Sequence, residues 1–285
     1  MKGGESIIEK NFYDNINVLE CIEKDGIKIE ILEYKTLRGL RDVCLAENLY
    51  YLEKAGMSLK QIKITLNNSA VTTERGALYF HKGNIVAECE TGGVGGLAKK
   101  LIKNRLTSES TFTPTYSGTG EIFLEPGFNH YILLELKNEA IIVDRGMFYC
   151  CENGISVEVS AQKNLSSGLF GGEGWFQTKI SGTGLCVLAI PVPPAEVLKY
   201  ELKNERLQVD GNFVFLRTAS LNFTVGRSAK NFVGNFTSGE GALQTFEGTG
   251  IVWMAPTQYV YKTLAQCFSA PLLNTSRSAD TSNDD

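Results

Sequence analysis

The chain has 285 residues, of which 43% are hydrophobic and 21% are charged, and its formal net charge is -4. This length allows one large domain or two small ones, with a core large enough to need no disulfide or metal. The slight acidic excess disfavours nucleic acid as a partner, because proteins that bind phosphate backbones usually carry a basic excess.

The cysteines and the N-terminal residues indicate the compartment. The seven cysteines include no C-x-x-C pair, and none has a histidine nearby in the sequence. We therefore expect reduced thiols, several of them buried as small hydrophobic side chains, and a reactive cysteine stays open as the alternative. The sequence shows no secretory signal, no mitochondrial transit peptide and no apolar run of about 18 residues. We expect a cytoplasmic protein without a transmembrane segment.

The first element that the sequence predicts is a helix over about residues 36–56, within an N-terminal extension of residues 1–57. Apolar residues recur there at helical spacing, and Gly56 suits the C-terminal cap. We expect this helix to pack against a β body. Its apolar stripe consists of Leu37, Leu40, Val43, Cys44, Leu45, Leu49 and Leu52.

Two sequence elements each occur three times, in the same order, in the part of the chain that follows. One is an acidic residue followed by Gly or Asn and then an apolar run, and it begins at Glu74, Asp144 and Asp210. The other is the triplet Gly-Thr-Gly, a short distance after a glutamate in a small or glycine-rich setting, at residues 118–120, 182–184 and 248–250. Repetition of both elements predicts three tandem units.

Each element has a structural interpretation. An acidic residue followed by glycine and an apolar run is typical of a turn that leads into a strand. The Gly-Thr-Gly triplet lies between apolar runs, which indicates a tight turn or a glycine bulge. The continuous apolar run after the triplet indicates a strand covered on both faces. Proline-rich links near Pro126 and Pro191 divide the domain, so we place the units at about residues 58–125, 126–191 and 192–257.

The remaining residues, 258–285, form a C-terminal segment. Its end is polar and rich in small residues, which predicts disorder from about residue 270.

Four stretches of the repeat region are specific as a set. They are LNNSAVTTERGALYFHKGNI, GG-x-GG-L, LFGGEGWF-x-x-K-x-x-GTG and LQVD. Together they resemble the altered-inheritance-of-mitochondria family over about residues 58–257. The resemblance implies three tandem copies of a β unit like that of the tryptophan RNA-binding attenuation protein, each a small antiparallel β-sandwich. The expected fold is therefore all-β with one N-terminal helix, and its three antiparallel β-sandwich-like repeats have a pseudo-threefold arrangement.

The resemblance also sets expectations about function. The family was formerly catalogued as a domain of unknown function in bacteria, and it has no established enzymatic activity and no agreed ligand. Its eukaryotic members are associated with mitochondrial inner-membrane organisation, a role that does not carry over to a chain in which no transit peptide is expected. We therefore expect a bacterial, cytoplasmic protein of unknown biochemical function.

The best ligand candidate is a glycine-rich loop over residues 92–103. Glycines ahead of a short helix with lysines could hold a phosphate. The loop lacks the G-x-x-x-x-G-K-[ST] pattern and any βαβ context, so a flexible lid or connector is the favoured interpretation. The candidate residues are Gly93, Gly95, Gly96, Lys99, Lys100 and Lys103.

No catalytic, cofactor-binding or metal-ligating residue is predicted. The two histidines, His81 and His130, lie in non-equivalent places, which excludes a metal site built mostly from histidine ligands. Two sets of repeated acids could form carboxylate rings, but hydrogen bonding of each acid within its own turn is favoured. No G-x-S-x-G elbow occurs, and we expect no cofactor. The two sets are Glu74, Asp144 and Asp210, and Glu109, Glu173 and Glu240.

The leading hypothesis is a non-enzymatic scaffold or interaction module with an unknown partner, whose open sheet edges favour self-association. The alternative is a protein that binds a small molecule or an anion, in a cleft between units or at the Gly92–Lys103 loop. A scaffold should show a large apolar outer patch, and a binding protein should show a pocket with convergent polar groups. An enzyme should show strongly shifted titrating groups inside such a pocket.

Overall fold

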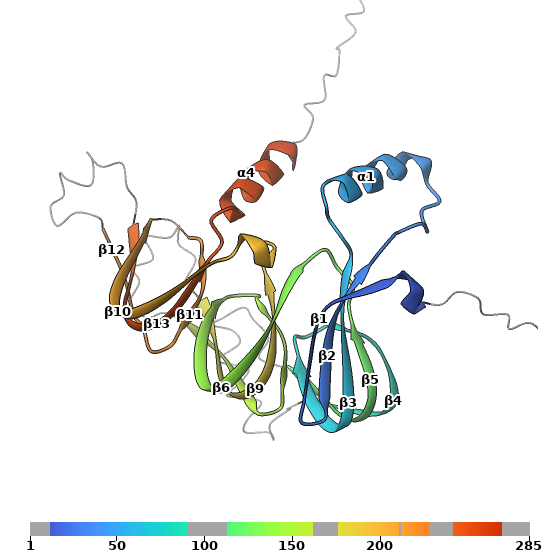
Figure 1. Cartoon of the computed structure of the whole chain (residues 1–285), viewed down its shortest axis with the longest axis horizontal. Helices are drawn as coiled ribbons and strands as arrows, with labels where there is room; N and C mark the ends of the chain where they lie inside the picture. The colour runs from blue at the N-terminus through green and yellow to red at the C-terminus, as the bar shows by residue number, and fades with distance from the viewer. Residues whose placement is uncertain (1–11, 90–112, 162–175, 211, 228–241, 270–285) are drawn as a thin grey trace, which may run out of the picture.

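The computed structural model describes residues 12–89, 113–161, 176–210, 212–227 and 242–269. These residues are mostly β: they form one antiparallel sheet of 13 strands, with two α-helices projecting at one end (Figure 1). The all-β prediction with an N-terminal helix is confirmed, whereas the second, C-terminal helix was not expected. The tail from residue 270, for which the sequence predicts disorder, lies outside the described residues.

The elements follow one another along the chain with short connections. The strands are β1 (Ile16–Lys24), β2 (Ile27–Tyr34), β3 (Lys60–Thr73), β4 (Leu78–Cys89), β5 (Pro114–Leu124), β6 (His130–Asp144), β7 (Phe148–Glu152), β8 (Ile155–Ala161), β9 (Phe176–Ile190), β10 (Leu198–Asp210), β11 (Val214–Thr218), β12 (Asn222–Arg227) and β13 (Ala242–Met254). The helices are α1 (Val43–Lys54) and α4 (Gln258–Ser269), with 3-10 turns η1 (Phe12–Asn15) and η3 (Pro194–Glu196). The main path of the sheet is β1-β2-β3-β7-β9-β6-β11-β13-β10.

The N-terminal extension contains a β-hairpin, β1–β2, that was not expected. Asp25 and Gly26 form its turn with φ of +48° and +82°, as the two central residues of a type I′ hairpin require. β2 pairs with β3 and buries Ile27 and Ile29 in the same hydrophobic cluster as the residues of β3 and β5. The hairpin therefore belongs to the β body.

Helix α1 is shorter than predicted, because it begins at Val43 rather than near residue 36. It ends as expected: Met57 N–H donates to the Leu52 carbonyl at 2.9 Å around Gly56, whose φ is +72°. Only Leu49 and Leu52 are half-buried among the described side chains of the helix. The helix therefore contacts the β body along one narrow edge.

Three long strand pairs share one local geometry: β3 with β5, β6 with β9, and β10 with β13. In each pair the register shifts at an asparagine of the first strand, whose φ is between +51° and +57°. The backbone N–H of this asparagine donates to the threonine hydroxyl of the facing Gly-Thr-Gly at 3.0 Å in all three pairs. The residue pairs are Asn68 with Thr119, Asn138 with Thr183, and Asn204 with Thr249.

The Gly-Thr-Gly triplets lie inside long strands, so their interpretation as tight turns is wrong. The bulge is real but belongs to the facing asparagine. Glycine is needed because the backbone of a third strand approaches closely. A Cβ on Gly118 would lie 2.0 Å from the carbonyl oxygen of Asn84, and one on Gly182 would lie 2.4 Å from that of Gly154.

The acidic–glycine element is confirmed as a turn in its first two copies. Gly76 and Gly146 have φ of +81° and +78° and lead into β4 and β7. The turn of the third copy includes residue 211, which lies outside the described residues.

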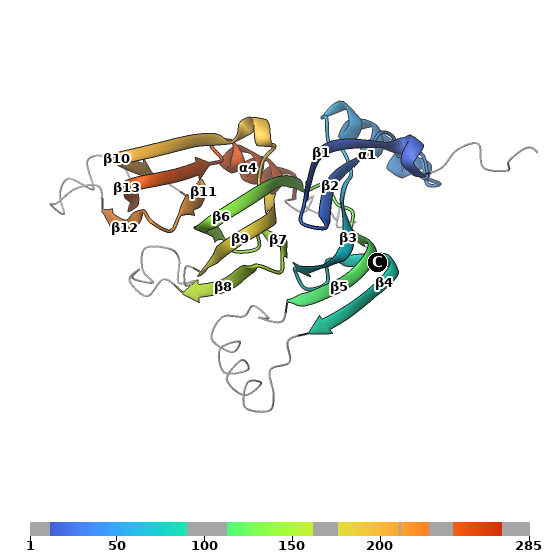
Figure 2. The same ribbon diagram turned by 60° about the horizontal axis from the view of Figure 1, so that its bottom comes forward.

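Two joints link the three strand pairs into one sheet: β7 pairs with β3, and β11 pairs with β6. Each strand pair contributes to a hydrophobic cluster of its own, and Ile122, Ile180 and Phe246 are fully buried members of the three clusters. β4 and β10 lie at opposite sides of the molecule (Figures 1 and 2). The pseudo-threefold arrangement, the likeness to the attenuation protein and the unit boundaries stay predictions.

Candidate functional site

A groove of 580 Å³ lies between the second and third strand pairs. It exists because β6 and β11 pair only at residues 141–143, so the first half of β6 diverges from β13. Three carboxylates line the groove beside apolar side chains: Glu135, Glu139 and Glu201. The apolar lining consists mainly of Leu134, Leu136, Ile141, Leu216, Ile251 and Trp253.

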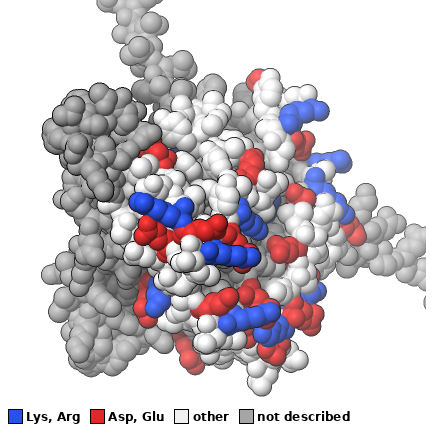
Figure 3. Space-filling model, turned by 60° about the vertical axis from the view of Figure 1, so that its left-hand side comes forward, with Lys and Arg blue, Asp and Glu red and all other residues white. Residues whose placement is uncertain are grey.

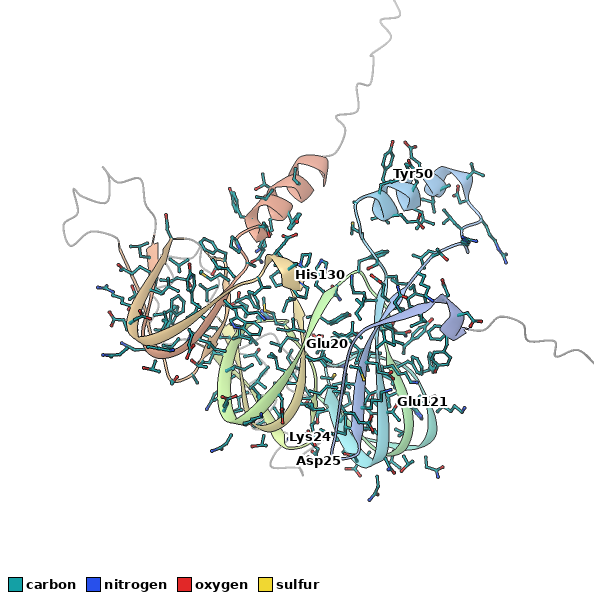
Figure 4. The ribbon with its side chains drawn as sticks, viewed as in Figure 1. Glu20, Lys24, Asp25, Tyr50, Glu121 and His130 are labelled. Atoms are coloured by element: carbon teal, nitrogen blue, oxygen red, sulfur yellow. The ribbon has the colours of Figure 1, made fainter. Side chains whose placement is uncertain are left out.

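Lysines from neighbouring strands neutralise part of this acidic lining. The Lys24 ammonium of β1 lies 2.8 Å from the Glu135 carboxylate, and this hydrogen bond lowers the pKa of Glu135. Lys199 of β10 lies over Trp253, with its ammonium 4.1 Å from the ring centroid. Burial raises the pKa of Glu20, on the same strand as Lys24, although a backbone hydrogen bond from β6 opposes the shift (Figure 4). Carboxylates and an aromatic face suit a cationic or apolar guest better than an anion.

The hydroxyl groups of the groove are engaged in structural hydrogen bonds. Ile251 N–H donates to the Thr218 hydroxyl at 3.1 Å, and the Ser220 hydroxyl donates to the Thr249 carbonyl at 3.0 Å. The residues that line the groove include no histidine, cysteine or lysine. The groove therefore presents no nucleophile paired with such a base.

Both helices project from one end of the sheet and expose apolar side chains (Figure 1). On α1, Val43 is 86% exposed and Tyr51 is 60% exposed, and on α4 Tyr259 is 73% exposed. A groove of 360 Å³ runs beneath α1. Its apolar lining includes Tyr34, Leu49, Leu52, Met57 and Phe128. This end of the molecule combines two apolar helical surfaces.

Helix α4 is held at its base by Glu196 of η3. The Glu196 carboxylate accepts hydrogen bonds from the hydroxyls of Thr257 and Tyr261, the latter at 2.8 Å, and these bonds lower its pKa. His130 at the start of β6 lies close enough to Glu196 to interact electrostatically, while burial and Lys60 lower the pKa of this histidine. The first turn of α4 is therefore fixed to the β body.

The three acids of the first predicted carboxylate ring lie at the turns of three different strand pairs. Glu74 follows β3, Asp144 ends β6 and Asp210 ends β10. Burial raises the pKa of Asp144 to about 6, although Lys262 of α4 and a hydrogen bond with Gln177 oppose the shift. Within the described ranges, no group of three His, Cys, Asp or Glu side chains could hold a metal ion.

Several predicted candidates lie outside the described residues. These are Gly93, Gly95, Gly96, Lys99, Lys100 and Lys103 of the glycine-rich loop, and the acids Glu109, Glu173 and Glu240.

The expectation of buried cysteines is confirmed for Cys150, Cys151 and Cys186. Burial raises the pKa of all three thiols, to about 12 for Cys151, so they stay protonated and unreactive. Cys21 is exposed, and partial burial also raises the pKa of its thiol.

Sequence reasoning missed the groove, since no motif marks Glu135 or Trp253. The groove arises where two strands diverge, which no local pattern records. The asparagine bulges did have a signal. The pattern Leu-x-Asn recurs at Leu66, Leu136 and Leu202, each two residues before a bulge asparagine.

Acidic and basic side chains alternate over the face that carries β10 and β13 (Figure 3). Arg206 lies 3.0 Å from Glu247, and Lys203 lies 3.6 Å from Glu201. Such a mixed surface lacks the basic stripe that phosphate backbones require. In the described part of the chain, neither helix is long and apolar enough to cross a bilayer.

The family model described as mitochondrial biogenesis AIM24 matches residues 52–257. None of the curated proteins matches the chain. Among solved structures, the chain is similar to the crystal structure of protein SPYM3_0169 from Streptococcus pyogenes, with 20% sequence identity and a TM-score of 0.52 over 74% of this chain and 94% of that chain. This likeness supports the fold alone. Because the family match covers most of the sequence, the resemblance read from the repeat motifs is confirmed, and the chain belongs to the AIM24 family.

Proposed function

We propose that this protein is a non-enzymatic, cytoplasmic scaffold that binds a protein partner through α1 and α4. The observation that carries the proposal is the exposed apolar surface of these two helices at one end of the sheet. Single exposed apolar side chains are normal on soluble proteins, whereas apolar clusters on projecting elements are typical of interaction sites.

The way the helices are attached supports docking. α1 contacts the β body mainly through Leu49 and Leu52, and α4 is held through Thr257 and Tyr261. Their remaining apolar side chains project outward. An apolar helix face that lies in a partner's groove is a common mode of protein recognition. The partner would therefore present an apolar groove.

The titrating groups give less support to an enzyme. An enzyme gathers strongly shifted groups in a pocket. The large upward shifts here fall on Asp144 and the buried cysteines, and none of these residues lines the 580 Å³ groove.

The test is co-purification from the native host, compared by quantitative mass spectrometry. The helix variant carries Val43→Ala, Tyr51→Ala, Tyr259→Ala and Val260→Ala, since alanine preserves helix propensity. The matched control carries Val18→Thr and Val86→Thr, which alter exposed apolar residues of β1 and β4 but keep β-branching.

A protein recovered in near-stoichiometric amounts with the wild type and the control, but lost with the helix variant, is the expected result. All altered positions are exposed, so each substitution should change the free energy of unfolding by less than about 0.5 kcal/mol. Equal recovery with the helix variant, or no partner with the wild type, would contradict the proposal.

A second candidate function is the binding of a small cation in the groove. The Lys199 ammonium over Trp253 marks an aromatic face that already attracts a positive charge. The three carboxylates of the lining disfavour an anion there. Titration with tetramethylammonium should give a saturable change in tryptophan fluorescence that Trp253→Phe abolishes. A non-saturable response, or the same response in the variant, would exclude this function.

A further inference from the structure

The chain contains the same strand-to-strand joint twice. In the first joint, β3 pairs with β7 in the register Val71–Glu152, Thr72–Cys151 and Thr73–Cys150. In the second, β6 pairs with β11 in the register Ile141–Thr218, Ile142–Arg217 and Val143–Leu216. Each joint begins three residues after a bulge asparagine on one strand and six residues after a turn acid on the other.

The backbone hydrogen bonds of the two joints also correspond. Asn153 N–H donates to the Ala70 carbonyl at 3.2 Å, and Ala219 N–H donates to the Ala140 carbonyl at 2.8 Å. Each acceptor lies two residues after its bulge asparagine. One geometry therefore generates both joints.

Both joints are closed to solvent. Cys150 and Leu216 occupy the same position in the two joints and are 0% and 1% exposed. Val71, Thr73 and Val143 on the facing strands are fully buried. The joints thus cover apolar side chains as well as backbone groups.

Each end of the chain's row of strands keeps one half of this joint without its counterpart. Residues 207–209 of β10 follow the bulge at Asn204 as the paired segments of β3 and β6 follow theirs. Residues 80–82 of β4 follow Glu74 as the paired segments of β7 and β11 follow their turn acids. Among the described residues, β10 pairs only with β13 and β4 only with β5. Phe80 is 47% exposed, whereas its equivalents in the two joints are buried.

The two halves cannot meet within one molecule, because β4 and β10 lie at opposite sides of it (Figures 1 and 2). We propose that copies of this chain associate head to tail, with β10 of one copy pairing with β4 of the next. Continuity with the internal joints fixes the register. The expected pairs are Leu207 with Lys82, Gln208 with His81, and Val209 with Phe80.

This pairing would bury Phe80 against Val209, and it places no two like charges opposite each other. It covers two open sheet edges at once, which is how natural sheets avoid uncontrolled pairing. A head-to-tail interface closes into a ring if its rotation allows and otherwise forms a filament. The inference goes beyond the proposed partner-binding role and uses no residue of α1 or α4, so the two can fail separately.

The first test is the mass of the full chain in solution, measured by light scattering over a dilution series. The variant is Gln208→Pro. Ala70 and Glu74 direct backbone groups across the first joint, so Thr72 between them does so too, and Gln208 is its equivalent. Proline is tolerated on an edge strand whose N–H faces outward.

The wild type should show a mass that is a multiple of 31.3 kDa, and Gln208→Pro should shift it to a single chain with an unchanged far-ultraviolet circular dichroism spectrum. A wild type that stays at 31.3 kDa at every concentration would overturn the proposal.

The second test fixes the register by cross-linking. Directly opposed residues of antiparallel strands have Cα atoms about 4.5–5.5 Å apart, which a disulfide can span. The double variant His81→Cys/Gln208→Cys should give a ladder of cross-linked multimers under mild oxidation. The control Asn84→Cys/Gln208→Cys moves one thiol along β4 beyond disulfide reach, and each single variant measures background from native cysteines. A double variant that cross-links no more than these controls would refute the register.

Discussion

Replacing Gly118 with alanine tests whether the neighbouring strand requires the Gly-Thr-Gly glycines. The φ of Gly118 is +132°, a region that costs other residues about 1–3 kcal/mol. The new Cβ would lie 2.0 Å from the Asn84 carbonyl oxygen, a backbone atom that cannot move without disturbing the β4–β5 pairing. Overpacking of this kind adds about 1–3 kcal/mol. We expect a loss of about 4 kcal/mol from the free energy of unfolding.

Gly76→Ala is the matched control, because Gly76 has φ of +81° but no atom within 4 Å of the added Cβ. It should cost only the left-handed backbone, about 1–2 kcal/mol. Urea unfolding followed by circular dichroism gives both values, provided the two variants share the wild-type m value. Equal losses in the two variants would refute the steric argument.

Three further predictions concern burial. Asp144 has a folded pKa of about 6 against 3.8, so its contribution favours the folded state below pH 3.8 and is lost as the pH rises to about 6. Asp144→Asn should therefore raise Tm above pH 6, and an unchanged Tm there would contradict the burial. Phe246→Ala should lower the free energy of unfolding by about 3–5 kcal/mol, because the ring is fully buried, while the exposed Tyr259→Ala should change it by less than about 0.5 kcal/mol in the same urea assay. Iodoacetamide should label Cys21 and spare Cys150 in the native protein, and peptide mapping that finds the reverse would show that Cys150 is accessible.

The local elements of the fold could be predicted where a residue type is dictated by its own backbone. Glycine after an acidic residue marked the turns at Gly76 and Gly146, because a left-handed φ follows from one residue's sterics. The apolar run from Ile122 to Leu124 indicated a strand covered on both faces, and these residues are buried. Such features depend on neighbours in the sequence.

Some local signals were present and were not used. Asp25-Gly26 between alternating isoleucines is a strong hairpin pattern, and the structure has a type I′ turn there. The stretch after Pro256 forms α4, although its position beside a polar tail obscured the helix.

Other features could not be predicted because they depend on distant strands. The role of the Gly-Thr-Gly glycines depends on a third strand whose carbonyl approaches Gly118. The pairing of Thr72 with Cys151 joins two strand pairs, and neither residue carries a motif. The groove beside Trp253 depends on the divergence of β6 from β13. Each requires a tertiary arrangement that local spacing does not specify.

Native mass spectrometry of the protein purified gently from its host tests the scaffold account most directly. We predict a mass that is a multiple of the 31.3 kDa chain, with or without a partner protein and without a small molecule at near-unit occupancy. A single chain that carries a stoichiometric small molecule or metal ion would contradict both the scaffold and the head-to-tail assembly.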